Sequence, residues 1–258
     1  MLQDSNNLAK LRNLKMTTAL TLTLIAAFAA LSSFVQRITG FGFGIVMMTM
    51  LPSVMPSYGE ATALSGILAA CMAIVPAIRK RRHLHLKKLL PILLTFLVLS
   101  YFSVKVLTVV DGHSLKRLFG IALIILSIYL FFFNDKVHLR PTIPVQISLG
   151  ALSGILGGLF AMQGPPAAVY FMASSEDKDE YMAATQCYFV CGNIMMTLFR
   201  WNSGFVTGTV CRSALLALPA VALGLWLGSI VHSRLHNDYL RKIVYLFLAF
   251  AGVLSVAS

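Results

Sequence analysis

Long apolar segments constrain the fold of this chain more than any other feature of its sequence. They are continuous runs rich in Leu, Ala, Ile and Met, and they cover about residues 16–55, 60–78, 89–107, 117–133, 144–174, 183–199, 210–231 and 239–257. Because roughly 20 apolar residues cross a bilayer as one helix, these eight segments predict an all-α integral membrane protein. A membrane β-barrel requires short segments of alternating polarity, and the sequence lacks that pattern.

The composition leaves almost no material for a domain in water. Charged residues make up 12% of the chain and hydrophobic residues 58%, whereas a soluble domain has roughly 25% charged residues. The connections between apolar segments are short, and the longest, 134–143 and 175–182, are too short to fold alone. We therefore expect a single membrane domain in contact with the lipid bilayer.

The first fifteen residues are polar and basic, and we interpret them as a cytoplasmic N-terminal tail. The apolar run that follows could resemble a signal peptide, but a signal h-region ends after about 7–15 residues. This run continues to about Met55, interrupted chiefly by Gln36 and Arg37. We expect it to stay in the protein as a membrane segment.

The excess of 21 Lys and Arg over 9 Asp and Glu is interpreted as a topology signal rather than as a nucleic-acid surface. If the N-terminus is inside and all eight segments span, thirteen basic residues lie inside and seven outside, with Arg37 left within the first segment. The positive-inside rule then predicts cytoplasmic N- and C-termini in the cell membrane. The basic run 79–88 would be inside and the acidic stretch 176–180 outside.

The two halves of the chain share an ordered set of short matches. Gly42 corresponds to Gly164, and three further pairs follow at offsets close to half the chain: 61–62 with 184–185, 90–91 with 218–219, and 115–117 with 240–242. The matches predict two membrane repeats of four segments, 16–134 and 144–258, joined by a linker at 135–143. Repeats of this kind are common in secondary transporters. The halves are parallel if every segment spans, and inverted if one segment in each half is re-entrant.

Each predicted repeat opens with a long segment that is broken near its middle. Glycines interrupt the first segment at 40–44, and Gln163-Gly164-Pro165-Pro166 interrupts the fifth. Proline lacks an N–H and glycine adds backbone entropy, so a continuous helix is unfavourable at either place. A broken helix inside a membrane must face protein or a water-filled cavity. The start of a half-helix presents N–H donors and a positive dipole end, which suit an anion.

We place the candidate substrate site at these breaks and at the polar residues beside them. A cation at Arg37 is costly in lipid, so it faces either a cavity or, by snorkelling, the headgroups. Gly40/Gly44 and Gly150/Gly154 have the spacing of helix-packing glycines but are assigned to function, whereas Gly224/Gly228 is assigned to packing. The predicted substrate-binding residues are Gln36, Arg37, Thr39, Gly40, Gly42, Gly44, Gln163, Gly164, Pro165, Pro166 and Asn193.

The titratable residues favour an anionic substrate and argue against an enzyme. Apart from Glu60 at the start of the second segment, no carboxylate falls deep in a segment, so a usual cation site is not visible. The four cysteines lack CxxC spacing, the six histidines fall in loops or at segment ends, and neither HExxH nor GxxxxGK[ST] occurs. We therefore expect no catalytic residues, no metal, no cofactor and a gradient as the energy source. A membrane scaffold or assembly factor is the alternative, and the coupling ion and homodimer formation stay open.

The motifs together resemble the TauE/SafE family of membrane permeases. The resemblance rests on Gln36 with Thr39-Gly40-Phe41-Gly42-Phe43-Gly44, on the segment 154–160 leading to Gly164-Pro165-Pro166, and on residues 115–120. It covers about residues 20–257. The resemblance implies transport of small sulfur-containing anions such as sulfite and organosulfonates. Gly-Pro-Pro with Gln163 replaces the glycine run frequent in other members, which affects the expected substrate more than the expected fold.

Overall fold

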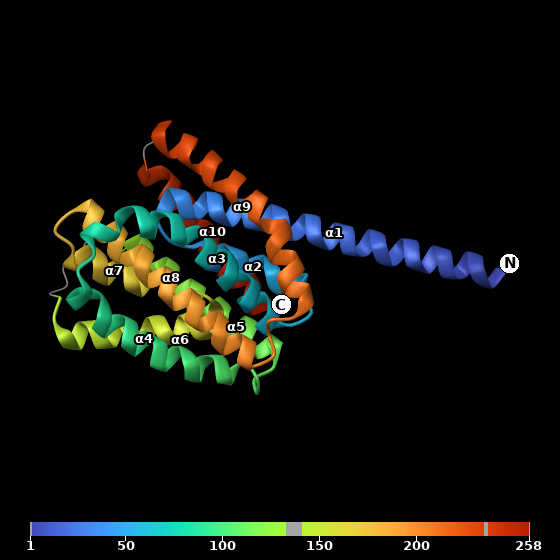
Figure 1. Cartoon of the computed structure of the whole chain (residues 1–258), viewed down its shortest axis with the longest axis horizontal. Helices are drawn as coiled ribbons and strands as arrows, with labels where there is room; N and C mark the ends of the chain where they lie inside the picture. The colour runs from blue at the N-terminus through green and yellow to red at the C-terminus, as the bar shows by residue number, and fades with distance from the viewer. Residues whose placement is uncertain (1, 133–140, 235–236, 258) are drawn as a thin grey trace.

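The computed structural model describes residues 2–132, 141–234 and 237–257, and these residues form helices without any strand (Figure 1). The elements are α1 (Leu2–Thr39), α2 (Phe43–Met50), η1 (Leu51–Ser53), α3 (Tyr58–Lys80), η2 (Arg81–His83), α4 (Leu86–Val106), α5 (Gly112–Phe132), α6 (Ile143–Phe160), α7 (Gly164–Ser174), α8 (Lys178–Asn202), α9 (Gly208–Arg234) and α10 (Asn237–Ala257).

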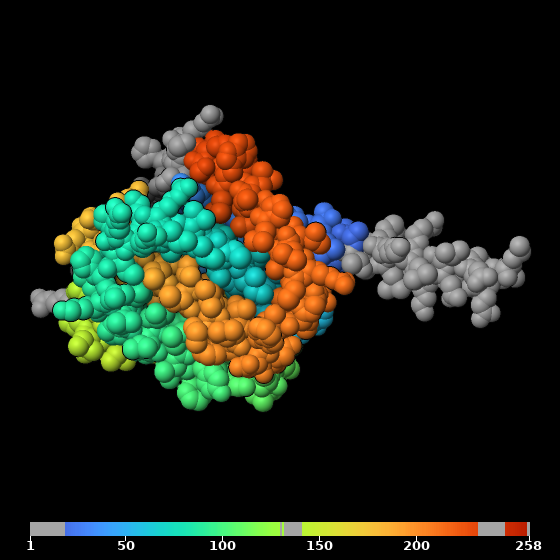
Figure 2. All heavy atoms as spheres, viewed as in Figure 1, coloured from blue at the N-terminus to red at the C-terminus, as the bar shows by residue number. Residues whose placement is uncertain are grey.

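Seven of the described helices are long and apolar enough to cross a membrane: α1, α3, α4, α5, α6, α8 and α9. In α10 the apolar stretch is shorter, Leu246–Val256. Large apolar side chains point outward from the bundle, among them Phe102 on α4, Ile125 on α5 and Leu215 on α9. In the view of Figure 2, α4, α8 and α9 form much of the visible surface. The prediction of an all-α integral membrane protein is confirmed.

Short polar residues determine where several helices begin. The Ser57 hydroxyl accepts a hydrogen bond from the N–H of Glu60 at 3.1 Å and so caps α3. The Asp177 carboxylate accepts from the N–H groups of Asp179 and Glu180, both at 2.8 Å, and caps α8. Such caps satisfy N–H groups that have no partner within the helix.

The two broken segments fold as re-entrant hairpins. Near the start of α6, the Gln146 amide donates to the hydroxyl of Tyr170, close to the end of α7, at 2.6 Å. In the first half, Ser32 of α1 lies beside Met47 of α2, with 3.7 Å between Oγ and Sδ. Both half-helices therefore run back along the helix before them. This is the re-entrant alternative, and the assumption that segments 16–55 and 144–174 each cross the membrane once was wrong.

The hairpins define the two faces of the bundle. We call one the Lys80 face, where α3 ends and α4, α6 and α8 begin, and the other the Tyr58 face, where α3, α5 and α9 begin. Helices α1 and α9 run in the same direction, because Gly224 lies against Ala30 and Gly228 against Arg37. The N-terminal end of α1 is therefore on the Tyr58 face, at the far right of Figure 1.

The packing of the helices is related between the two halves: replacing each helix by its counterpart in the other half turns the α1–α9 pair into the α6–α4 pair. Helix α1 packs on α9 and α6 packs on α4, while α3 packs on α8 and α5 on α10. In the second half α6 runs from the Lys80 face towards the Tyr58 face, opposite to α1. The two halves thus run in opposite senses through the membrane.

Two ion pairs overturn the predicted sidedness of the polar loops. Lys80 lies 2.7 Å from Asp179, and Lys88 lies 2.7 Å from Glu180. The basic run 79–88 and the acidic stretch 176–180 are therefore on one face, and placing them on opposite sides was wrong. The N-terminal end of α1 and the C-terminal end of α10 both lie on the face opposite Arg81, so the prediction that the termini share a side with the basic run 79–88 was wrong. The physical reason is that a hairpin adds no crossing, which changes the side of the loops that follow.

Candidate functional site

The first break, between α1 and α2, is closed by the side chains that we predicted to bind substrate. Gly40 and Gly42 have φ values of +83° and +107°, a region that glycine occupies without steric cost. The Gln36 Oε1 accepts from the N–H of Phe43 at 2.9 Å, and its Nε2 donates to the carbonyl of Gly40 at 3.3 Å. Thr39 donates to the carbonyl of Val35 at 3.0 Å. Gln36 and Thr39 thus shape the turn and orient α2.

The second break, between α6 and α7, is held by a buried polar group. Helix α6 ends at Ala161, which has a left-handed φ of 54°. The Ser153 hydroxyl donates to the carbonyl of Gln163 at 2.6 Å and lies 2.7 Å from the hydroxyl of Tyr188. The Gln163 side chain is buried, and its Oε1 has no hydrogen-bond partner. One polar acceptor is therefore available at the start of α7.

The two prolines change what the start of α7 can donate. Pro165 and Pro166 occupy the first turn, where a helix normally has N–H groups without an intrahelical partner. Proline has no N–H, so the backbone of this turn offers fewer donors than the sequence argument assumed. The Gly164 N–H remains, and the side chain of Gln163 supplies the other polar group at this end.

The two breaks touch each other in the middle of the bundle. A methyl group on Gly44 would overlap the carbonyl oxygen of Ala161. A methyl group on Gly164 would lie 3.2 Å from Cβ of Phe41 in the first break. Glycine at 44 is thus required by the close approach of two backbones, a role that Gly40, with open space around it, does not share.

A cavity of about 1020 Å³ leads from the Lys80 face to these breaks. Ser65, Gln186 and Asn193 line it beyond the breaks, and Lys80, Glu176 and Asp179 line it at the Lys80 face. The structure brings ten of the eleven predicted site residues to its wall: Gln36, Arg37, Thr39, Gly40, Gly42, Gly44, Gln163, Gly164, Pro165 and Asn193. Pro166 is buried within α7 and is not part of the wall.

Arg37 lies on the cavity wall but is exposed rather than enclosed. The first carbons of its side chain pack against Gly228, where a methyl group would approach Cβ of Arg37 to 2.8 Å. Gly228 and Gly224 are packing positions, as the sequence indicated. Gly150 and Gly154 are packing positions too, because Cβ atoms there would lie 2.7 Å from the carbonyl oxygens of Ile92 and Phe96 on α4; assigning them to function was wrong.

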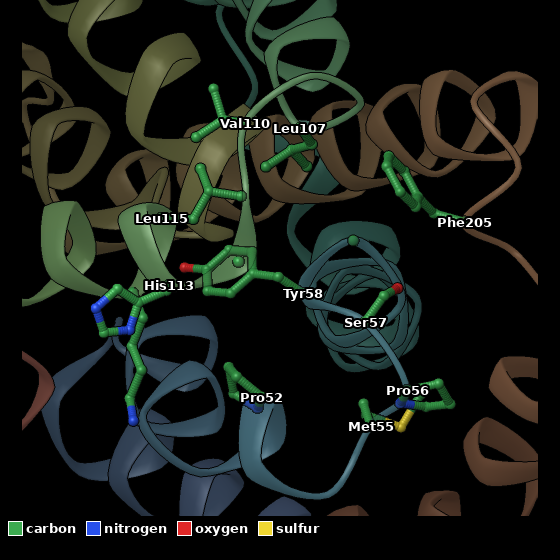
Figure 3. A pocket seen from close by; sticks show the side chains of 13 residues that line it. Pro52, Met55, Pro56, Ser57, Tyr58, Leu107, Val110, His113, Leu115 and Phe205 are labelled. Carbon is green, nitrogen blue, oxygen red and sulfur yellow. The ribbon is translucent and has the colours of Figure 1, made fainter. Parts of the chain in front are cut away.

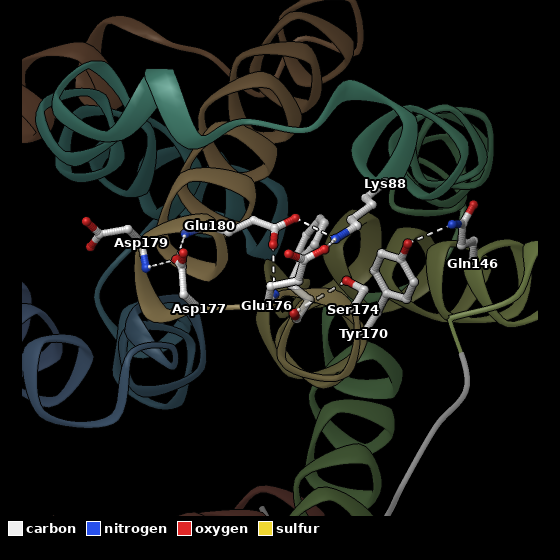
Figure 4. A network of polar contacts seen from close by, with 9 residues as sticks. Lys88, Gln146, Tyr170, Ser174, Glu176, Asp177, Asp179 and Glu180 are labelled. Carbon is white, nitrogen blue, oxygen red and sulfur yellow. Dashed lines mark hydrogen bonds and ion pairs between the residues drawn. The ribbon is translucent and has the colours of Figure 1, made fainter.

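Ion pairs surround the mouth of the cavity (Figure 4). Lys88 lies between Glu180, at 2.7 Å, and Glu176, at 3.8 Å. The second oxygen of Glu180 accepts from the N–H of Glu176 at 2.7 Å, which ties the end of α7 to α8. Lysines therefore pair with Asp179, Glu176 and Glu180, whereas Asp177 at the cavity wall caps α8. The sequence argument missed these residues because it placed them on opposite sides.

A second, smaller pocket of about 450 Å³ lies on the Tyr58 face (Figure 3). The Tyr58 side chain extends towards His113 and Leu115, and Phe205 lies on the other side of α3. A methyl group on Gly59 would overlap the ring of Phe205, so the ring packs directly on the α3 backbone. This pocket and the larger cavity open from opposite faces of the bundle.

These features define a class: a multi-pass helical membrane protein in which two broken hairpins meet at a cavity. The chain belongs to the sulfite exporter TauE/SafE family, whose model matches residues 24–255. It is 22% identical over 245 residues to a protein of Cupriavidus necator named "Probable sulfite/organosulfonate exporter TauE", covering 83% of this chain and 86% of that protein. No solved structure matches the chain.

Proposed function

We propose that this protein is a secondary transporter that exports a small sulfur oxyanion or organosulfonate across the cell membrane. The observation that carries the proposal is the cavity of about 1020 Å³ that reaches two touching helix breaks. Paired breaks in corresponding places of two halves are typical of transporter binding sites. Membership of the TauE/SafE family and the name of the Cupriavidus necator relative support an anionic sulfur compound as the substrate.

The substrate site that we propose lies between the N-terminal ends of α2 and α7. Both ends bring the positive end of a helix dipole to the cavity, and the Gly164 N–H adds a hydrogen-bond donor beside it. Asn193 and Ser65 lie deeper on the cavity wall. Of the predicted residues, Gln36 and Thr39 act indirectly, because their polar atoms already hold the first break in place.

The arrangement of the two halves supports a mechanism of alternating access. We assign residues 16–134 and 144–258 to two inverted repeats joined at 135–143, a linker that lies largely outside the described residues. The α1–α9 pair becomes the α6–α4 pair when each helix is replaced by its counterpart in the other repeat. A rocking movement of one repeat against the other would close the large cavity and enlarge the pocket beside Tyr58. The present structure is then the state open to the Lys80 face.

We assign the Lys80 face to the cytoplasm. It carries the six basic residues of the segment 79–88 and Lys178, and positive residues in short loops favour the cytoplasmic side. The N-terminal end of α1 would accordingly lie on the outer side. In this orientation the cavity open to the Lys80 face is where an exporter takes up its substrate.

Reconstitution tests the proposal. Purified protein in liposomes is expected to carry labelled sulfite, sulfoacetate, taurine or thiosulfate across the bilayer, with saturation as the concentration rises. Empty liposomes and liposomes holding Gly164→Leu are the controls. Wild-type protein that carries none of the four compounds, although it is folded and inserted, would favour the scaffold alternative.

A further inference from the structure

The largest fully buried side chain in the described part of the chain is that of Arg200, near the end of α8. Arg200 lies just outside the apolar segment 183–199 that the sequence predicts. Its exposed fraction is 0%, and burying an arginine away from water without an opposite charge is costly. None of the described carboxylates forms an ion pair with it. A buried arginine without an ion pair therefore indicates a functional role.

One nitrogen of the Arg200 guanidinium, Nη2, has a clear structural role. Nη2 donates to the carbonyl oxygens of Gly157 at 2.9 Å and Gly158 at 3.2 Å. Both carbonyls belong to the last turn of α6, where the carbonyl of Gly157 also accepts from the N–H of Ala161 at 3.0 Å. Nη2 therefore clamps the end of α6, next to the second break.

The other two nitrogens of the guanidinium, Nε and Nη1, take no part in these bonds to α6. Nε and Nη1 of Arg200 are buried and have no hydrogen-bond partner. A Cβ on residue 66 of α3 would lie 2.9 Å from Nη1, 3.7 Å from Oγ1 of Thr197 and 3.8 Å from Oδ1 of Asn193. Nη1 therefore lies directly against the α3 backbone at Gly66, with the polar side chains of Thr197 and Asn193 beside it.

The polar groups around Nη1 lie next to the deepest part of the large cavity. Asn193, Thr197 and Arg200 are spaced so that they share one face of α8. Asn193 lines the cavity, as does Ser65, whose buried hydroxyl also has no partner. Arg200 does not line the cavity and is sealed from it in this state. Polar groups therefore continue from the cavity floor towards the Tyr58 face.

The same line of residues reaches the second pocket. The Tyr58 hydroxyl is buried without a hydrogen-bond partner, and the N–H of Phe205 donates to the carbonyl of Arg200 at 2.9 Å. Tyr58, Gly59 and Phe205 line the pocket on the Tyr58 face. Tyr58 and Phe205 thus separate Arg200 from that pocket.

We propose that the unpaired donors of Arg200, Nε and Nη1, form a second anion-binding position, which the substrate occupies on its way from the large cavity to the pocket beside Tyr58. Nε and Nη1 are charge-assisted donors, each of which suits one oxygen of a sulfite or sulfonate group. The inference rests on the proposed transport function and adds a deeper position to it. Tyr58 and Phe205 form the barrier on the exit side.

The test uses binding and transport of labelled sulfite and sulfoacetate by wild type, Arg200→Gln, Arg200→Lys and Gly66→Ala. Arg200→Gln is expected to weaken binding about tenfold to a hundredfold, the effect of a lost charge-assisted hydrogen bond, with Arg200→Lys in between. Gly66→Ala keeps the clamp but places a methyl group beside Nη1, and it should raise the half-saturating concentration about tenfold. Gly208→Ala, in open space at the start of α9, is the matched control.

The outcomes separate this proposal from the transport function. Unchanged affinity in a folded Arg200→Gln variant would show that Arg200 is only a clamp. If the Arg200→Gln variant does not fold, the Gly66→Ala variant provides the test. A half-saturating concentration equal to that of wild type in Gly66→Ala would then overturn the second anion-binding position. A wild-type protein that binds the probes but does not move them overturns the transport function, while loss of binding in Arg200→Gln and Gly66→Ala still supports the anion position. A wild-type protein that neither binds nor moves either probe overturns both.

Discussion

The ammonium of Lys80, in the last turn of α3, lies 2.7 Å from the carboxylate of Asp179, in the first turn of α8. The contact joins two residues 99 positions apart, and it fixes the sidedness of the loops that contain them. It also places both residues at the mouth of the large cavity. The first prediction follows from this contact.

Positions 81 and 178 should be accessible from the same side of the membrane. In a background with the four native cysteines replaced by serine, Arg81→Cys and Lys178→Cys are each treated in intact cells with an impermeant thiol reagent. Because we assign the Lys80 face to the cytoplasm, neither should react until the membrane is permeabilised. Labelling of one position alone in intact cells would contradict the re-entrant hairpin between them.

The two lysines of the mouth should differ in their effect on stability. The Lys80 and Asp179 side chains are 38% and 43% exposed, and exposed pairs contribute at most about 1 kcal/mol. Glu180 is only 5% exposed, so Lys88→Met leaves a buried carboxylate with one fewer partner, at a cost of about 2 kcal/mol. Thermal unfolding in detergent should show a larger fall for Lys88→Met than for Lys80→Met. Equal falls in unfolding temperature for the two variants would show that burial of Glu180 does not determine the loss of stability.

Glycines at the breaks and glycines between spanning helices should respond differently to Leu. Gly164→Leu fills the space beside Phe41 at the proposed site, so transport should be lost while folded protein is still recovered. Gly228→Leu collides with the stem of Arg37, at a packing contact between α1 and α9, and should instead reduce the yield of folded protein. Size-exclusion chromatography and uptake, measured on the same preparations, distinguish the two effects. Identical behaviour of the two variants would contradict the assignment.

Arg37 should influence substrate capture more than substrate affinity. It is exposed at the cavity wall, where its charge attracts anions over a distance that salt screens. Arg37→Gln should slow uptake at low ionic strength by about threefold and have little effect at high salt. Uptake rates at two salt concentrations provide the measurement. A salt-independent loss of affinity as large as that expected for Arg200→Gln would place Arg37 in the binding site itself.

The fold class could be predicted from sequence because continuous apolar runs of this length have few other structural solutions. The breaks were also predictable, since Gly164-Pro165-Pro166 and the glycines near Gly42 disfavour a continuous helix. The direction of the chain after each break was not, because an apolar helix has the same pattern whether it continues across the membrane or turns back. Contacts such as Gln146 with Tyr170 decide that direction, and no local pattern encodes them.

The site could be predicted in part for a similar reason. The polar residues beside the breaks were found, but Gln36 and Thr39 satisfy their hydrogen bonds within the turn, which depends on backbone geometry. Arg200 was missed because the predicted apolar segment ended at residue 199. Its spacing of seven residues from Asn193, on one face of α8, was the signal that could have identified it. Gly66, its neighbour on α3, has no local feature that marks it.

The most direct test of the central claim is a counterflow measurement. Liposomes containing the wild-type protein are loaded with unlabelled sulfite and diluted into a trace of labelled sulfite. A carrier with alternating access should accumulate label transiently above its equilibrium level, and Gly164→Leu should abolish this overshoot. Wild-type liposomes that equilibrate the label without an overshoot, or that exclude it as empty liposomes do, would contradict the account.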